Sequence, residues 1–331
     1  MIKTEKMKLY PLKFRPILKS MIWGGNDIAP FKQIQTSQEN IGESWEISGV
    51  EGNISVVANG TLAGKPLDEL LTEYKGTLIG NHNYERFGNR FPLLIKFIDA
   101  RSDLSIQVHP NDELAKKRHN SFGKTEMWYV IKASKEAFLY TGFKKQITPG
   151  EYVKTVADNT FTDTLQRYDV NPGDVFFLPA GRVHAIGAGC FVAEIQQTSN
   201  ITYRIYDYNR QDANGNYREL HTELAKDAID YRVYDSYKTD YTPTLNRPVH
   251  LASCPYFTTN LLELNEPITR DYAQLDSFVI YICMRGATEI KDNEENIISL
   301  RQGESLLLPA TINSTQIEPT GTGTKILETY V

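Results

Sequence analysis

The stretch from Gly173 to His184 constrains this chain more than any other, because its letters follow the fixed spacing G-x5-P-x-G-x2-H. Gly173 leads into a short apolar run that predicts a strand. Pro179 and Gly181 then predict a tight turn, because few other residues adopt the backbone angles that such a turn needs. The histidine after the turn would lie at one end of the strand, where its ring can bind a metal ion or simply meet solvent.

The spacing resembles the second metal-binding motif of cupins, which are β-barrel proteins. A second stretch, 303–314, repeats the glycine, the five residues and the proline, but Thr311 replaces the second glycine and Ser314 replaces the histidine. We therefore predict a bicupin of two β-barrel (jelly-roll) domains. Residues 1–245 would form a metal-binding catalytic domain, and residues 246–331 a degenerate domain without metal. A chance match between two strand-and-proline turns is the alternative.

The rest of the chain predicts a mainly β protein with a few short helices. Runs rich in Val, Ile, Phe and Tyr alternate with clusters of Gly, Pro, Asn and Asp, as expected for many short antiparallel strands. We expect helices over 65–74, 112–119, 148–157 and 218–229, the third of which opens with a Thr-Pro-Gly-Glu capping pattern. The 331 residues, 40% of them hydrophobic, suffice for two domains with a sizeable core.

Composition argues against several classes of protein. A formal net charge of -5 and the lack of a basic run argue against a nucleic-acid partner. No apolar run near the amino terminus is long enough for a secretory or membrane-spanning segment, so we expect a cytoplasmic protein without a membrane partner. The three cysteines, Cys190, Cys254 and Cys283, form no C-x-x-C pair, which favours buried thiols over a disulfide framework or a thiolate zinc site.

Partners for the motif histidine lie on strands upstream of it. Alternation along 104–112 puts Gln107 and His109 on one face of a strand, together with Ser105. In the next strand, Glu126 shares a face with Lys124. Either polar face could simply meet solvent, and spacing alone does not decide between solvent and a metal ion.

Taken together, these strands offer four nitrogen and oxygen donors: Gln107, His109, Glu126 and His184. Such a mixed set suits zinc, manganese or iron, and it includes no thiolate. Open cupin sites usually keep positions for water or substrate, so we interpret the set as catalytic rather than structural. Two later strands add further polar faces, one with Glu194 and one with Arg204.

Four motifs carry a closer resemblance. In chain order they are GESWE at 42–46, SIQVHP at 105–110, KTE at 124–126 and QQTSNITYR at 196–204. Together they resemble type I mannose-6-phosphate isomerase, and the match runs from about residue 11 to the end of the chain. The stretch between Glu126 and His184 is too short for the large helical insert of the fungal and animal enzymes, so the chain resembles the short bacterial form.

The resemblance implies reversible interconversion of mannose 6-phosphate and fructose 6-phosphate through a cis-enediol, with one zinc ion per chain. The implied zinc ligands are the same four residues that strand alternation collects. It also implies that Arg204 lies beside the substrate with Glu194 near it. The implied phosphate contacts are Ser105, Lys96 and Lys124.

The base that moves the proton is left open between Glu194 and Lys124. A guanidinium is a poor base, so Arg204 would anchor the substrate or stabilise charge. Glu194 is favoured because a carboxylate needs a smaller pKa shift than a lysine to act near neutrality.

Two other functions compete with the isomerase: a metal-dependent cupin dioxygenase and a non-catalytic sugar-binding bicupin. A dioxygenase would more often have H-x-H where this chain has Gln107 and His109, and it needs no phosphate-binding cations. A sensor would be expected to carry a partner or nucleic-acid module, and none is visible. We expect a small sugar phosphate as the partner, and a monomer or a homodimer.

Overall fold

The computed structural model describes residues 8–211, 214–321 and 323–331, and the chain divides into two compact units. The central unit contains residues 17–45 and 93–240, and the terminal unit contains residues up to 16, 46–92 and 241–331. This division differs from the predicted cut between residues 245 and 246. The carboxy-terminal segment, 241–331, packs with two segments from the amino-terminal half of the chain. One of them ends at residue 16 and the other is 46–92, and the strands and loops of 241–331 supply hydrogen-bond and apolar partners to both.

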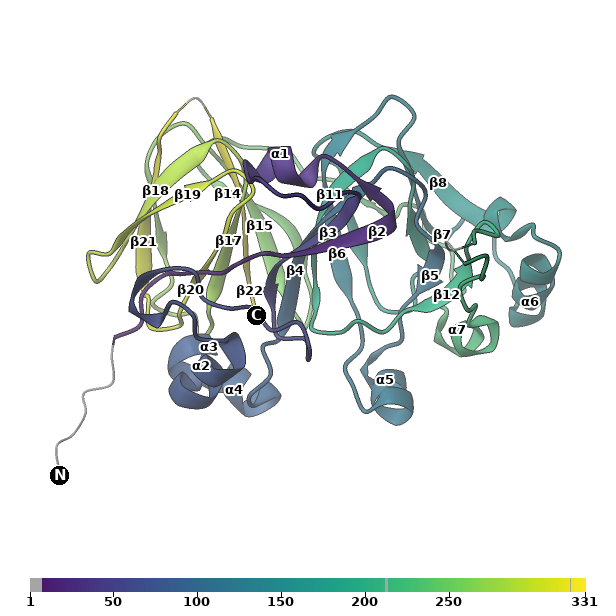
Figure 1. Ribbon diagram of the computed structural model, residues 1–331, viewed down its shortest axis with the longest axis horizontal. Coiled ribbons are helices and arrows are strands. Elements are labelled where there is room, and N and C mark those ends of the chain that lie inside the picture. The colour runs from purple at the N-terminus through teal and green to yellow at the C-terminus, as the bar shows by residue number, and fades with distance from the viewer. Residues whose placement is uncertain (1–7, 212–213, 322) are drawn as a thin grey trace. The chain divides into compact units, whose positions relative to one another are not determined.

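Two antiparallel sheets build the described part of the central unit (Figure 1). The larger sheet has the order β13 (Lys238–Thr239), β9 (Val175–Leu178), β6 (Glu126–Ala133), β11 (Cys190–Gln197), β4 (Leu93–Ala100), β2 (Ile17–Gly25) and β3 (Ile41–Ser48). The smaller sheet has the order β12 (Tyr203–Tyr206), β5 (Ile106–Val108), β10 (His184–Ile186), β7 (Phe138–Phe143) and β8 (Leu165–Asp169). The mainly β prediction is confirmed. However, no ladder in the described chain joins the two sheets, so they are open sheets rather than a closed barrel.

Alternation along the strands decides which side chains face the interior between the two sheets. Trp128 and Val192 of the larger sheet belong to one buried apolar cluster with Leu139 and Ile186 of the smaller sheet. The two faces pack together because each strand presents every second side chain to the same side. The resulting core packs the two sheets face to face, next to the polar residues described below.

Helices cover the other face of the smaller sheet. Ile106 and Val108 of β5 pack in a second apolar cluster with Tyr152 of α6 (Pro149–Ala157) and Ala225 of α7 (Thr222–Ala228). Gln107, between them in sequence, therefore points to the opposite side, as alternation predicts. The remaining helices of this unit are α1 (Ile28–Lys32), α5 (Asp112–His119) and the 3-10 turn η2 (Phe161–Thr164).

The predicted helices occur at the expected places, with one that is shorter. α5 lies where it was expected, and α6 begins with the predicted capping box, in which Thr148 and Glu151 satisfy each other's backbone N–H groups. The helix predicted over 218–229 begins only at Thr222. Arg218 instead extends to Asp207, and the backbone N–H of His221 donates to the Arg204 carbonyl oxygen.

The terminal unit repeats this plan in its described residues. Its larger sheet has the order β1 (Leu12–Lys13), β20 (Ser305–Leu308), β17 (Val279–Arg285), β22 (Thr324–Tyr330), β15 (Thr258–Leu264) and β14 (Pro248–Ser253). Its smaller sheet has the order β16 (Ile268–Asp271), β21 (Ser314–Pro319), β18 (Ala287–Asp292) and β19 (Ile297–Arg301). The predicted helix over 65–74 is α2 (Leu67–Tyr74). The short 3-10 turn η1 (Gly60–Leu62) precedes it, and α3 (Gly76–Ile79) and α4 (Asn81–Phe87) follow it.

The repeated motif is confirmed at the level of the backbone. In each copy a short strand ends at a proline, whose carbonyl oxygen accepts from the N–H three residues later: Arg182 to Pro179 at 3.0 Å, and Ile312 to Pro309 at 2.9 Å. The turn then leads into β10 in the central unit and into β21 in the terminal unit. Among the described residues, no helix has the length and apolar character needed to cross a membrane.

Candidate metal centre

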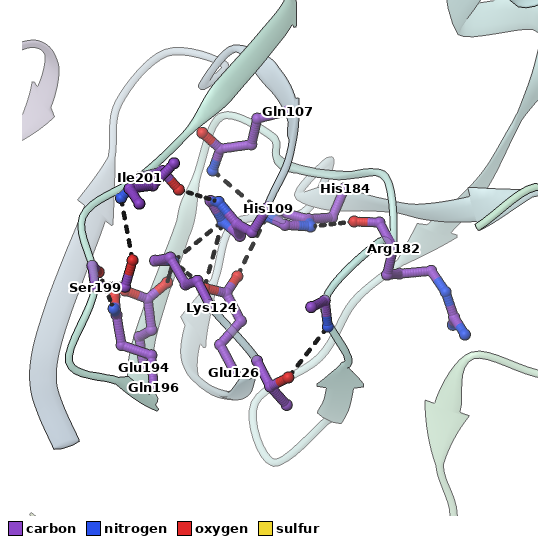
Figure 2. Close-up of polar contacts among 12 residues, drawn as sticks. Gln107, His109, Lys124, Glu126, Arg182, His184, Glu194, Gln196, Ser199 and Ile201 are labelled. Atoms are coloured by element: carbon purple, nitrogen blue, oxygen red, sulfur yellow. Dashed lines mark hydrogen bonds and ion pairs between the residues drawn. The ribbon is translucent and has the colours of Figure 1, made fainter. Parts of the chain in front are cut away.

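Three side chains from three strands of the central unit converge on one buried point (Figure 2). His109 directly follows β5, Glu126 begins β6 and His184 begins β10. The strand register explains the meeting, because His184 lies opposite Gln107 in the β5–β10 ladder. One ligand atom from each of the three lies within 4.8 Å of the others, and at most 1% of each residue is exposed. Three of the four predicted ligands are thus brought together.

Backbone contacts fix which nitrogen of each imidazole can bind a metal ion. Nδ1 of His109 lies 2.8 Å from the carbonyl oxygen of Ile201, and Nδ1 of His184 lies 2.8 Å from that of Arg182. A carbonyl oxygen only accepts, so each Nδ1 carries the proton and donates it. Each Nε2 then presents its lone pair toward Glu126, at 3.6 Å from Oε2 for His109 and 3.2 Å from Oε1 for His184.

Burial also favours the neutral form of both rings. It lowers the pKa of His109 well below its usual range, with smaller contributions from the charges of Lys124 and His184. Burial and the Lys124 ammonium lower the pKa of His184 to about 3. Neutral imidazole is the form that binds metals.

The donor set fits a divalent cation in two further respects. Oε1 of Glu126 is buried and accepts no hydrogen bond from the described residues, which is costly for a carboxylate unless a cation satisfies it. The ammonium group of Lys124 contacts Oε2 of Glu126 and lies 3.1 Å from Nε2 of His109, so a positive charge already stands among these donors. The group can therefore hold a metal ion.

Gln107 lies at the edge of this group. Its Nε2 is 3.5 Å from Nε2 of His184, and the side chain also lines a cavity of about 350 Å³. A half turn of the carboxamide presents Oε1 at the same position, which gives Gln107 the oxygen that a metal ligand requires. Lys124 lines the cavity as well, so these two residues connect the buried group with the open space.

Charged residues on the larger sheet continue from the metal group along the cavity wall. Glu194 of β11 lies between its register partners Lys96 and Trp128. Its Oε1 accepts from the Trp128 indole at 3.0 Å, and its Oε2 lies 3.2 Å from the Lys96 ammonium. Lys124 approaches Oε1 of Glu194 to 3.8 Å. Both predicted base candidates therefore lie side by side.

The surroundings of Glu194 keep it ionised. Burial alone would raise its pKa, but the ammonium groups of Lys124 and Lys96 and the indole N–H outweigh burial and hold the pKa well below its usual range. The same pairing acts in reverse on Lys96, where two carboxylates, Glu194 and Glu43, outweigh burial and raise the pKa. A raised pKa would make Glu194 a stronger base, whereas its surroundings lower the pKa.

The remaining predicted residues also line the cavity. Ser105 and Lys96 lie on its wall, and Arg204 of β12 lies opposite Gln107 in the β5–β12 ladder. Nη1 of Arg204 donates to the carbonyl oxygen of Glu219 at 2.9 Å. All of the predicted site residues thus lie at the metal group or on the wall of one cavity.

Comparison with known proteins shows which family the chain resembles. Residues 12–136 match the model of the phosphomannose isomerase type I catalytic domain, and residues 248–327 match that of the mannose-6-phosphate isomerase cupin domain. The chain is 35% identical over 320 residues to mannose-6-phosphate isomerase ManA of Bacillus subtilis, covering 94% of this chain and 97% of that protein.

The chain belongs to the mannose-6-phosphate isomerase family.

Further relatives of the family agree with this assignment. The mannose-6-phosphate isomerase of Streptococcus mutans is 34% identical, covering 93% of this chain and 95% of that protein. The crystal structure of the mannose 6-phosphate isomerase from Bacillus subtilis matches with a TM-score of 0.86 at 31% identity, covering 97% of this chain and 99% of that one. A variant of phosphomannose isomerase from Salmonella typhimurium shares the fold, with a TM-score of 0.78 at 15% identity.

Membership of the mannose-6-phosphate isomerase family makes the chain an isomerase with a cupin domain, as the motifs predict. It decides against the dioxygenase and against the non-catalytic sugar-binding protein. Sequence reasoning missed two groups on the cavity wall: Glu43 with Trp45, and Arg218. The GESWE motif contained the signal for the first pair. Nothing near Arg218 in the sequence marks it as part of the site.

Proposed function

We propose that this enzyme interconverts mannose 6-phosphate and fructose 6-phosphate with one zinc ion held by Gln107, His109, Glu126 and His184. The observation that carries the proposal is the buried His109, Glu126 and His184 group in a chain of this family. Both imidazoles present Nε2 to the same carboxylate, and its Oε1, 3.2 Å from Nε2 of His184, accepts no hydrogen bond from the described residues. A bound zinc ion would polarise the carbonyl and hydroxyl oxygens of the sugar.

The proton transfer is assigned to Glu194, with Lys124 beside it. Glu194 is ionised and so able to accept a proton, and the Trp128 indole fixes the orientation of its carboxylate. Lys124 stands between Glu194 and the metal ligands, where an ammonium group stabilises negative charge that develops on the enediol oxygens. In this arrangement the carboxylate accepts the proton from C2 and returns it to C1.

Ser105, Lys96 and Lys124 are the phosphate contacts that the family resemblance implies. Ser105 lines the cavity and remains a candidate. Lys96 and Lys124, however, are each engaged by carboxylates, which leaves less of their charge for an anion. The two lysines are better suited to hold Glu194 and the reacting end of the sugar.

Turnover of mannose 6-phosphate before and after metal removal tests the proposed function. The purified enzyme should form fructose 6-phosphate, lose this activity on exhaustive chelation and regain it with zinc. His184→Ala should lose bound zinc and turnover while the protein stays folded, because a buried ligand is removed but the β10 ladder remains. His250→Ala, which replaces a histidine on β14 of the terminal unit, is the matched control and should retain both. Full activity after complete metal removal would overturn the proposal.

A further inference from the structure

The charged residues that line the cavity form two groups, one around the metal ligands (the metal end) and one around Arg204 and Arg218 (the arginine end), and the two groups differ in charge balance. At the metal end, the ammonium groups of Lys96 and Lys124 meet three carboxylates, namely Glu43, Glu126 and Glu194. Glu126 is a proposed zinc ligand, so the two remaining carboxylates, Glu43 and Glu194, match the two lysines in number. A phosphate placed against either lysine would also lie near these two carboxylates, which repel it.

Guanidinium groups dominate the other end of the cavity. Arg204 and Arg218 both line it, together with Asn200 and Thr202. Nε of Arg204 is buried and has no hydrogen-bond partner in the described part of the chain. A buried N–H without an acceptor is costly, so this donor is matched to a group that the chain itself does not supply.

One buried carboxylate fixes the position of Arg218. Nε of Arg218 donates to Oδ2 of Asp207 at 2.7 Å, and its Nη2 contacts Oδ1 of the same residue. Asp207 is also paired with Arg210, so one carboxylate serves two guanidinium groups. Among the described residues, the other acidic group that acts on Arg204 is Glu219, whose side chain is 82% exposed and therefore screened by water. The described residues at this end therefore carry an excess of positive charge.

We propose that Arg218, positioned by Asp207, binds the phosphate of the substrate together with Arg204. A phosphate monoester carries a charge of about -1.5 to -2 near neutrality, which the excess of arginine charge can balance. Nε and Nη2 of Arg218 already contact Asp207, but a guanidinium carries five N–H donors in one plane, so its remaining N–H groups can bind phosphate while Asp207 holds the side chain in place. The proposal rests on the proposed function, because it assigns the phosphate end of the same sugar.

The register of the smaller sheet shows where Arg204 lies relative to the proposed zinc ligands. Arg204 of β12 lies opposite Gln107 of β5, and Gln107 lies opposite His184 of β10. The arginine end is therefore one strand away from the proposed zinc ligands. A sugar phosphate that reaches from the metal end to Arg204 and Arg218 would leave its reacting carbons beside Glu194 and Lys124.

Kinetics of Arg218→Met in the zinc-loaded enzyme test this assignment. We expect KM for mannose 6-phosphate to rise by about 10- to 100-fold, with a much smaller change in kcat and with bound zinc unchanged. The dissociation constant of inorganic phosphate, measured by calorimetry, should rise in parallel. Arg218→Lys should recover only part of the affinity, because it restores the charge without the planar set of N–H donors. Asp207→Asn should raise KM in the same direction, since it loosens the guanidinium that Asp207 holds.

Arg167→Met is the control, because Arg167 is an exposed residue of the same unit whose ion pair with Asp169 lies on β8. It should change neither constant. Unchanged KM and phosphate affinity in Arg218→Met, with both raised in Lys96→Met, would overturn the assignment in favour of the lysine. Phosphate binding is measured without turnover. A wild-type enzyme that binds phosphate through Arg218 but does not isomerise mannose 6-phosphate would refute the proposed function and leave the phosphate site standing.

Discussion

Glu194 occupies a position where charge and geometry favour proton transfer but basicity does not. Its carboxylate is held by the Trp128 indole and by Lys96, and these partners keep it ionised. They also weaken it as a base, so in the proposed proton transfer Glu194 would act through its position and its ionised state rather than through a raised pKa. Lys124, at 3.8 Å from the same carboxylate, is the competing candidate.

Glu194→Gln should separate the two candidates. The amide keeps the shape of the side chain and removes the proton acceptor, so kcat should fall by about 100-fold or more. Bound zinc should stay unchanged, and exchange of the C2 proton of the substrate with solvent, followed by NMR in deuterium oxide, should be lost. Glu136→Gln, at an exposed position before β7, serves as the control. Proton exchange that continues in Glu194→Gln would assign the base to Lys124.

Strand alternation places the proposed ligands Gln107 and Glu126 on polar strand faces without any knowledge of the fold, although it does not by itself distinguish a metal site from solvent. The residues that orient the ligands could not be found in this way. Nδ1 of His109 bonds the carbonyl oxygen of Ile201 and that of His184 bonds the carbonyl oxygen of Arg182, and a backbone carbonyl leaves no mark in the sequence. The environment of Glu194 depends on Lys96, which only the β4–β11 register brings next to it.

At the scale of the element, the two units use the same sheet position for different purposes. Strands β6, β11 and β4 are neighbours in the central unit, as β17, β22 and β15 are in the terminal unit. Glu194 faces Lys96 and Trp128 in the first set, and Glu328 faces Asn260 and Tyr281 in the second. The repeated glycine and proline therefore predicted a shared turn and strand plan, but not what the interior of the second unit contains.

The second interior is occupied by an internal ion pair. Glu328 is fully buried and accepts from Nε of Arg270 at 2.8 Å, from Nη2 of Arg270 at 2.9 Å and from Nδ2 of Asn260 at 2.8 Å. Tyr272 donates to it as well, at 2.5 Å. Because these hydrogen bonds satisfy both carboxylate oxygens of Glu328, we interpret the network as structural. The expected lack of a metal in this unit stays a prediction.

Glu328→Gln should therefore lower stability without altering catalysis. Removing the charge leaves Arg270 without its partner in a half-buried position, which should reduce the free energy of unfolding by about 2–4 kcal/mol. Zinc content and kcat, measured well below the thermal transition, should match the wild type. Glu263→Gln is the matched control, since Glu263 pairs with Lys325 across the β15–β22 ladder at a more exposed site and should cost less than about 1 kcal/mol. Equal losses in the two variants would contradict the structural role of the network.

At the scale of the whole molecule, the chain is interleaved rather than serial. The terminal unit takes strand β1 and the helices α2 to α4 from the amino-terminal half of the sequence. A domain plan drawn from one repeated motif could not anticipate this, because the partners of these segments are identified only by long-range pairing. Leu12 lies opposite Leu307 in the β1–β20 ladder, and Phe91 packs against Phe278 with ring centroids 4.8 Å apart.

A fragment that ends at residue 245 tests this interleaving. The cut falls at the predicted domain boundary, but it removes the carboxylate of Asp276, which accepts from the first N–H groups of α4 at 2.8 and 2.9 Å. It also removes Ala310, whose N–H donates to the carbonyl oxygen of Leu78. The cut also removes Phe278 and so uncovers Phe91, and we therefore expect the fragment to bind a hydrophobic dye and to be cleaved by protease within residues 46–92.

The full-length chain should resist both treatments under the same conditions, and adding residues 246–331 as a separate polypeptide should restore part of the protection. This recovery distinguishes loss of specific partners from a general failure of the fragment to fold. Hydrogen exchange measured by mass spectrometry would locate the effect, because backbone amides in 67–87 should exchange rapidly in the fragment and slowly in the full chain. Cooperative unfolding of the fragment, with 46–92 protected, would mean that residues 1–245 form a domain on their own and that packing against the carboxy-terminal strands adds little to their stability.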